Sequence, residues 1–396
     1  YEKGEELLHK AKRKGDSHAM LRIAYLQHKA EAGYQENVTE KALARYRGIV
    51  PGLSTTDRAI AHMLIANIYR NYYNGNRYRI VRNATATQPS ADYTTWSRET
   101  FIDTIGHYYA LALQEREALL RCPVEQCDIL TDGNEQGRLL RPTLYDVIVQ
   151  EIIETPENVE ADEESVSILA NDSLYGDDVC FAQMHLPQSK QPYIRQLRLL
   201  QSLTRAHQTD DIALRASLDL LRMEYVKRAS QLYNPDLYIK HIETFAEEYR
   251  KSPAWCAEFL YRLASHYVPN AWGEQSTENK AKAIAYCQEA IRIAPKSNGG
   301  KMCKNLYDDI VRPTIGLASN EIVLPEEGSV VRISYKNTPK LYFRIVRGSM
   351  DEDRYRIRFT ELTGRRVVRK WEVQTDCPDA YTTHMVLADL PALGAG

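Results

Sequence analysis

The segment VVRISYKNTPKLYFRIV, residues 330–346, decides the fold because apolar and polar residues alternate along most of it. A period of two residues is typical of β-strands that bury one face. We predict strands at 330–335 and 341–346, joined as a hairpin through the turn Asn337-Thr338-Pro339. Before residue 314 the apolar residues instead recur at steps of three and four, the helical period. The sequence therefore predicts a change from helices to strands near residue 315.

Further strands are predicted at 355–359, 366–369, 371–373 and 384–388. About six short strands in so few residues indicate a small antiparallel β-sandwich. In the 355–359 strand, alternation places Arg354, Arg356 and Arg358 on one face and Tyr355, Ile357 and Phe359 on the core face. The apolar turn that begins at Leu390 leads us to expect another strand after residue 396, in a longer chain.

The N-terminal part of the sequence predicts paired helices with short loops. Asp16 or Ser17 stands at an N-cap position, Ser54-Thr55-Thr56-Asp57 opens a helix that ends near Asn74-Gly75, and Thr94-Thr95-Trp96-Ser97 caps one that reaches Leu120. Other helices are predicted near residues 7–11, 20–25, 42–49, 143–152, 192–207, 210–232, 237–249, 253–267, 277–294 and 297–311.

The segment 283–295 is similar to the second helix of a tetratricopeptide unit, with small residues where helices meet and a proline just past its end. No strict 34-residue period extends over the rest of the helices. We therefore predict an irregular, tetratricopeptide-like α-solenoid in which each helical hairpin buries its apolar face on the next.

An acidic stretch separates the two groups of helices, since residues 142–189 contain no Lys or Arg. We interpret it as a solvated face or a mobile connector, and a calcium site is the alternative. The acidic residues concerned are Glu157, Glu160, Asp162, Glu163, Glu164, Asp177 and Asp178.

The seven cysteines are spread along the chain, which does not match the dense disulfide framework of a small secreted domain. Cys122 and Cys127, on either side of a turn with Pro123, could form a disulfide or half of a metal site. No second ligand pair at zinc-binding spacing is present in the sequence, so we predict no metal. In Cys122-Pro-Val-Glu125-Gln126 the acid and amide come one position later than in the Cys-x-Glu-Gln motif of internal thioesters, so we predict no thioester here.

Sequence motifs of common enzyme classes are missing: Gly-x-Ser-x-Gly, a phosphate loop, Gly-x-Gly-x-x-Gly and His-Glu-x-x-His do not occur. Glu243 and Glu247 share one side of a predicted helix without defining an acid–base pair. We predict a protein that is not an enzyme and has no catalytic, cofactor-binding or metal-binding residues. The alternative is an enzyme with a pocket in which titratable side chains converge around His107 or His185.

Charge and aromatic composition point to contacts with proteins. The net charge of −2 provides no field that attracts nucleic acid, and 26 Tyr against 6 Phe suits half-buried surfaces that meet other proteins. A basic group in the predicted strands is either a solvated face or a docking face for an acidic neighbouring domain. It comprises Arg332, Lys336, Lys340, Arg344, Arg347, Arg354, Arg356, Arg358, Arg365, Arg366, Arg369 and Lys370.

Membrane insertion is not predicted for this segment, because no run of about 18 apolar residues occurs. Residues 1–14 lack the apolar core of a signal peptide, so export would need a leader that precedes residue 1.

Four short segments resemble a known family. They are Thr95-Trp96-Ser97, Arg141-Pro-Thr-Leu-Tyr-Asp146, Cys303-Lys-Asn-Leu306, and Val331-Arg-Ile-Ser-Tyr-Lys-Asn337 followed by Leu341-Tyr-Phe-Arg344. The sequence resembles the helical prefix and the first macroglobulin β domain of large bacterial alpha-2-macroglobulin-like proteins.

This resemblance implies a helical domain over 1–314 and a macroglobulin-like β-sandwich over 315–396. It also implies an extracytoplasmic protein, periplasmic or associated with the outer membrane or cell surface, that traps peptidases after they cut a bait segment. The bait and thioester regions would lie beyond residue 396, so no family site residue transfers to this sequence.

We thus expect a non-enzymatic scaffold whose partners are other domains of the same longer chain, and peptidases through downstream regions. The alternative is an unrelated tetratricopeptide-like adaptor of the cell envelope that binds a protein or glycan.

Overall fold

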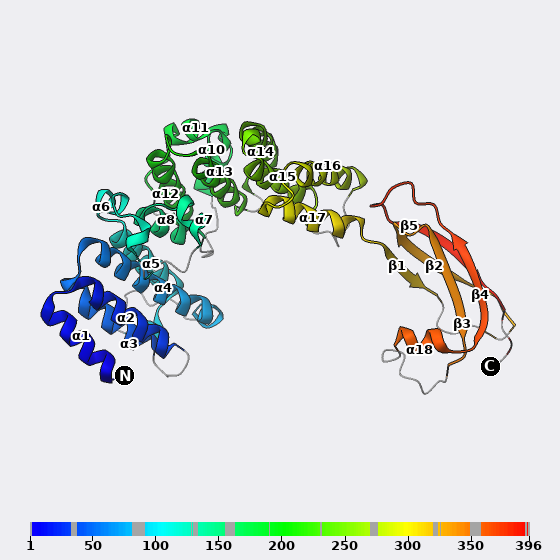
Figure 1. The fold of residues 1–396 in the computed structure, drawn as a ribbon, viewed down its shortest axis with the longest axis horizontal. Coiled ribbons are helices and arrows are strands. Elements are labelled where there is room, and N and C mark those ends of the chain that lie inside the picture. The colour runs from blue at the N-terminus through cyan, green and yellow to red at the C-terminus, as the bar shows by residue number, and fades with distance from the viewer. Residues whose placement is uncertain are drawn as a thin grey trace. The chain divides into compact units, whose positions relative to one another are not determined.

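The computed structural model describes residues 2–32, 38–80, 92–127, 129, 134–154, 163–189, 191–229, 232–269, 276–319, 324, 326–348, 358–392 and 394. The chain forms two compact units, Tyr1–Tyr238 and Ile239–Gly396. Most of the described chain is helical, and a few short strands form antiparallel sheets near the C-terminus. The predicted α+β class is therefore confirmed (Figure 1).

In the first unit, successive helices lie against one another: α1 on α2, α2 on α3, α3 on α4 and α4 on α5, and later α11 on α12 and α12 on α13. Helix α12 also packs on α8. The helices are α1 (Glu2–Lys14), α2 (Ser17–Glu31), α3 (Val38–Ile49), α4 (Thr55–Ile80), α5 (Arg98–Ala112), α6 (Arg116–Leu120), α7 (Glu135–Leu140), α8 (Leu144–Glu154), α9 (Glu163–Leu169), α10 (Asp172–Tyr175), α11 (Asp178–Gln183), α12 (Pro192–Ala206) and α13 (Ile212–Lys227), with short 3₁₀ turns that include η3 (Val124–Gln126). Helix α14 (Pro235–Glu248) begins in this unit and continues into the second one.

Side-chain caps set several helix starts where the sequence predicts them. The Asp16 carboxylate accepts a hydrogen bond from the Ala19 N–H at 3.0 Å at the start of α2. The Ser97 hydroxyl does the same for the Thr100 N–H at 3.3 Å at the start of α5. These bonds satisfy backbone donors that have no partner inside the helix.

Two predicted helix ends are wrong. Helix α4 continues past Asn74-Gly75 to Ile80, because Tyr73 and Ile80 are both buried and their packing outweighs the local stop signal. The predicted helix that reaches Leu120 is two helices, since α5 ends at Ala112 and α6 begins only at Arg116.

The mobile connector predicted for the acidic stretch is wrong over its described residues 163–189, whereas Glu164 and Asp177 are exposed, as a solvated face requires. Residues of this part form α9, α10 and α11. Asp177 caps α11 by accepting from the Cys180 N–H at 2.7 Å, and Asp178 is buried and accepts from Arg215 Nε at 2.8 Å. Glu157, Glu160 and Asp162 lie outside the described residues, and the described part of the chain holds no acidic cluster suited to a metal ion.

The second unit joins helices to strands. Helix α17 packs on both α15 and α16, and the change from helix to strand falls between Val311 and Thr314. The division into domains 1–314 and 315–396 remains a prediction. The elements are α15 (Pro253–Tyr267), α16 (Thr277–Ile293), α17 (Asn298–Val311), β1 (Thr314–Ala318), β2 (Ser329–Lys336), β3 (Lys340–Val346), α18 (Phe359–Gly364), β4 (Val367–Gln374) and β5 (His384–Leu390).

The strands form two small antiparallel sheets, β1-β2-β5 and β3-β4. One apolar core joins the sheets, and its buried members are Val331, Ile333, Tyr335, Leu341 and Ala388. The two sheets thus share a core, and the strands predicted at 330–335, 341–346 and 384–388 are confirmed, while the β-sandwich remains a prediction.

The predicted hairpin between the first two of these strands is wrong, because β2 and β3 belong to different sheets. Strand β2 has both edges occupied, by β1, which the sequence reading missed, and by β5. The chain turns at Asn337, which has a positive φ of 49° and donates from its side chain to the Val311 carbonyl at 2.8 Å. This anchor directs the chain into the second sheet.

The predicted strand at 355–359 is also wrong for the two of its residues that the structure describes, Arg358 and Phe359. Phe359 starts α18 and is 78% exposed, so it does not point into the core as expected. Residues 355–357, with Arg354 and Arg356, lie outside the described residues. The strands predicted at 366–369 and 371–373 are one continuous strand, β4.

Candidate functional site

The main candidate site is a pocket of about 460 Å³ in the first unit, between helices α5 and α12. A volume of this size suits a small ligand or a few residues of a peptide. Most of its wall is apolar, and the lining residues are Ile102, Ile105, Gly106, Tyr109, Ala110, Leu113, Ile152, Gln188, Ser189, Pro192, Arg195, Gln196, Arg198 and Leu199.

Two polar side chains in the lining of this pocket, Arg195 and Gln196, could bind a ligand. Gln196 is only 8% exposed, and it lines the pocket. Arg195 is exposed and reaches across to α5, where a Cβ added to Gly106 would lie 3.3 Å from Arg195 Nη2. The Gln196 amide can both donate and accept hydrogen bonds and the Arg195 guanidinium can donate them, so these two side chains could hold a polar group of a ligand.

The enzyme alternative has no convergent pair of titratable groups in this pocket. His107 and His185 are exposed, and neither belongs to the lining. The Tyr109 hydroxyl donates to Asn67 Oδ1 at 2.8 Å and accepts from Arg70, so it serves packing between α4 and α5.

The glutamates noted in the sequence are engaged in surface contacts of the second unit. Glu243 accepts from the Tyr286 hydroxyl at 2.7 Å, and Glu247 pairs with Arg250 Nε at 2.6 Å. These contacts hold helix surfaces and do not bring the two carboxylates to a common site.

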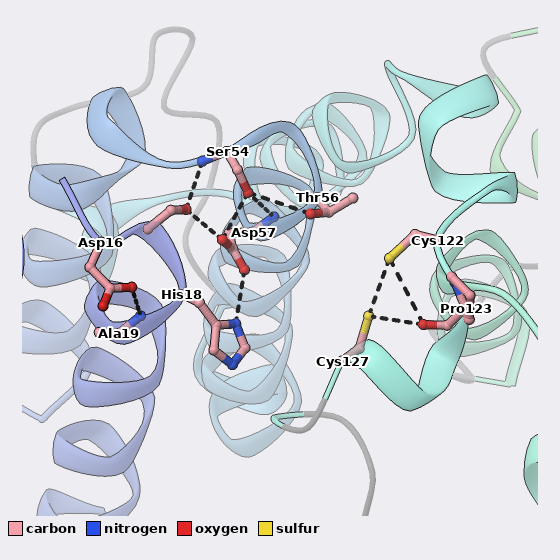
Figure 2. Close-up of polar contacts among 10 residues, drawn as sticks. Asp16, His18, Ala19, Ser54, Thr56, Asp57, Cys122, Pro123 and Cys127 are labelled. Carbon is pink, nitrogen blue, oxygen red and sulfur yellow. Dashed lines mark hydrogen bonds and ion pairs between the residues drawn. The ribbon is translucent and has the colours of Figure 1, made fainter.

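A Ser–His–Asp group that sequence reading missed lies between the starts of α2 and α4, and Figure 2 shows that its contacts do not make a catalytic triad. Asp57 accepts from the Ser17 and Ser54 hydroxyls and lies 3.4 Å from His18 Nδ1. The Ser54 N–H donates to Ser17 Oγ at 2.7 Å. A triad needs its serine bonded to the histidine, whereas this serine donates to the acid, so the group caps α4 and ties it to α2.

Cys122 and Cys127 are close together at one turn (Figure 2). Their sulfur atoms are 3.7 Å apart, and the two thiols are not bonded in a disulfide. Each sulfur lies 3.9 Å from the Pro123 carbonyl oxygen. The intervening Glu125 and Gln126 are exposed in η3.

A second buried group that sequence reading missed is His207, placed between two carboxylates at the end of α12. Its Nε2 lies 2.7 Å from Asp146 Oδ1 and its Nδ1 lies 2.5 Å from Asp210 Oδ2. Because both carboxylates only accept hydrogen bonds when ionised, the ring must carry a proton on each nitrogen. Burial opposes this charge, but the hydrogen bonds and charges of Asp146 and Asp210 outweigh it and raise the pKa of His207.

The described members of the predicted basic group lie on the strands and in the segments next to them, whereas Arg354 and Arg356 lie outside the described residues. Arg347, Arg365 and Arg366 line a shallow hollow with Val367 and Val368, and Arg369 and Lys370 are exposed further along β4. Arg365 donates to the Arg347 carbonyl at 3.2 Å. Because that acceptor is neutral, the bond does not cancel the arginine charge, and the hollow is locally cationic. Lys336 is different, because it is buried and donates to the Ile310 carbonyl at 2.5 Å.

No family model, curated protein or solved structure matches this chain. Among the described residues, no helix has the length and apolar character needed to cross a membrane.

Proposed function

We propose that this chain is a non-enzymatic interaction scaffold, the N-terminal segment of an extracytoplasmic alpha-2-macroglobulin-like protein that traps peptidases. In this proposal the helices are an irregular tetratricopeptide-like solenoid, and the strands are the start of a macroglobulin-like module. The partners are the other domains of a longer chain, and peptidases meet the downstream regions. The protein would work in the periplasm or at the cell surface.

The proposal rests on one observation. The residues of the C-terminal segments that resemble the family lie in the core between the two sheets. Val331, Ile333 and Tyr335 on β2 and Leu341 on β3 are all buried in the core that joins the sheets. The most specific part of the resemblance therefore coincides with the residues that specify this core. Residues that maintain a fold are expected at such positions.

The helical segments that resemble the family also contain residues that stabilise helix starts. Trp96 is buried beside the cap Ser97 at the start of α5. Thr143 and Asp146 bond each other at the start of α8, with the Thr143 N–H donating to Asp146 Oδ2 at 2.8 Å. These contacts support a likeness in architecture and assign no inhibitory residue to the chain.

The test compares this chain with the longer natural protein that contains it. Each is mixed with a general peptidase in rising ratio, and hydrolysis of a large protein substrate is measured together with capture of the peptidase on a sizing column. We expect the longer protein to capture the peptidase and this chain alone to leave its activity unchanged. A stoichiometric loss of activity with this chain alone would falsify the proposed division of labour.

A second function, an envelope adaptor that binds a partner protein, is favoured by the pocket between α5 and α12. Its apolar wall, the Gln196 amide and the Arg195 guanidinium suit an apolar peptide side chain next to an acidic group. The test is a pull-down from envelope extract with the chain and with Arg195→Glu. Arg121→Glu, which changes an exposed arginine outside the pocket, is the matched control.

An adaptor should retain a discrete partner with the unchanged chain and the control, and lose it with Arg195→Glu. If the extract yields no retained partner, or if both variants behave alike, the adaptor function is contradicted.

A further inference from the structure

The turn at Cys122-Pro-Val-Glu-Gln-Cys127 brings two thiols together with a geometry that suits a covalent bond. The sulfur atoms are 3.7 Å apart, whereas a disulfide needs about 2.05 Å, so the two side chains must rotate toward each other for the bond to form. We propose that Cys122 and Cys127 form an intramolecular disulfide by exchange with a small-molecule disulfide.

The backbone between the two cysteines is held in place by its own turn. The Gln126 N–H donates to the Pro123 carbonyl at 3.0 Å, and the Cys127 N–H donates to the Val124 carbonyl at 2.9 Å. Proline fixes its own φ, here −62°, and so limits the conformations of the turn. The backbone therefore keeps the two thiols near each other without a covalent bond between them.

The start of α8 holds the same turn from the other side. The Leu144 N–H donates to the Cys122 carbonyl, and the Val124 N–H donates to the Pro142 carbonyl, each at 2.9 Å. Pro123 also forms a β-bridge with Thr143. Because these bonds fix the backbone on both flanks, little conformational entropy remains to be lost when the disulfide closes.

The two thiols differ in exposure, which sets the order of the reaction. Cys122 is partly exposed, while Cys127 is 3% exposed. The Cys122 thiolate attacks one sulfur of the small disulfide, which gives a mixed disulfide and releases one small thiolate. The Cys127 thiolate then attacks the Cys122 sulfur and releases the second small thiolate. The two protons lost by the cysteines end on the two released thiols, so the protein is oxidised by two electrons and the small disulfide is reduced by two.

A metal site is the competing use of two adjacent thiols. A structural zinc site needs four ligands, and no group of three or more His, Cys, Asp or Glu residues suited to a metal ion occurs in the described ranges. The geometry therefore favours the disulfide over the metal half-site, and the bond would fix the connection between α6 and α8.

The experiment uses the whole chain and oxidised glutathione as the probe. After incubation, remaining thiols are alkylated, the protein is digested with trypsin, and the segment 122–138, which follows Arg121 and ends at Arg138, is weighed. We expect this peptide to be about 2 Da lighter than its reduced form, unalkylated, and restored by a reducing agent. The melting temperature of the oxidised chain should rise by a few degrees, because the cross-link restricts the unfolded state.

Single variants test the order of attack. In Cys127→Ser the mixed glutathione disulfide should accumulate on Cys122, and in Cys122→Ser the buried Cys127 should remain reduced. Cys180→Ser, which removes an exposed thiol on α11, is the control and should leave oxidation of the 122–138 peptide unchanged. Circular dichroism confirms that each variant is folded. The proposal is overturned if the unchanged chain accumulates a mixed disulfide at Cys122, or if this pair stays reduced while Cys180 is modified.

Discussion

The contact of His207 with Asp146 and Asp210 gives the sharpest prediction for the stability of the first unit. It joins the end of α12 to the start of α8 through Asp146, which is 61 positions away in the sequence, and to the loop before α13 through Asp210. His207 is 5% exposed and Asp146 is 3% exposed, so the ion pair between them is shielded from water. Asp210 is 42% exposed in its side chain and contributes less.

The perturbation is His207→Gln, which removes the positive charge and keeps a hydrogen-bonding side chain. Breaking a buried ion pair by removing one partner costs about 3–5 kcal/mol, because the other charge is left buried. Asp146 keeps its bond from the Thr143 N–H, so we expect a loss in the free energy of unfolding of about 3 kcal/mol. For a unit of this size that corresponds to a fall in melting temperature of about 6–12 °C.

The pH dependence follows from the raised pKa of His207. Burial opposes the charge, but the hydrogen bonds and charges of the two aspartates raise the folded-state pKa above the unfolded value of about 6.5. The folded chain then holds this proton more tightly than the unfolded chain. The stabilisation is fully present below pH 6.5 and is lost as the pH rises through the folded-state pKa, with a slope of up to about 1.4 kcal/mol per pH unit.

The assay is urea unfolding followed by circular dichroism, at steps from pH 6 to pH 9, for the unchanged chain, His207→Gln and the control His185→Gln. His185 is exposed, so its variant should follow the unchanged chain. The difference in stability between the unchanged chain and His207→Gln should shrink as the pH rises. A difference that stays constant, or grows, over this range would refute the assignment of a charged His207.

Three further substitutions test the packing. Gly299→Ala should lower the melting temperature of the second unit and the yield of folded protein, because the new Cβ would lie 2.4 Å from the backbone of Ala257 on α15. Arg222→Leu should cost about 3–5 kcal/mol in urea unfolding, because it removes the guanidinium that pairs with the buried Asp219 carboxylate at 2.7 Å. Ile333→Ala should cost about 2–5 kcal/mol, measured by loss of near-ultraviolet dichroism on heating, since it opens a cavity in the core between the sheets.

Local sequence signals predicted the elements whose determinants are local. The caps Asp16 and Ser97 bond donors three residues further on, so sequence spacing alone reveals them. The alternation in β2 likewise reflects one buried face. The pairing of β2 could not be predicted in the same way, because it depends on β1 and β5, which lie before and well after it in the sequence.

The candidate sites also differ in whether their determinants are local in the sequence or come from distant segments. The proximity of Cys122 and Cys127 could be inferred from their spacing and the intervening proline, whereas the choice between disulfide and metal needed the surrounding ligands. The pocket and the His207 contact were not predictable, because each is assembled from helices that meet only in the folded unit. The His207 ring, for example, bonds through Nε2 to Asp146, a residue 61 positions earlier in the sequence.

The composition of the acidic stretch 142–189 explains why its helices were not predicted. Because it contains no Lys or Arg, every cation that neutralises it must come from another part of the chain. Arg70 on α4 pairs with Glu151 at 2.8 Å, and Arg215 on α13 pairs with Asp178 at 2.8 Å. Without these partners the carboxylates would repel one another, and hydration would favour an extended chain. The described helices of this stretch are therefore held by tertiary contacts that the local composition conceals, and these helices and the cations around them stabilise each other.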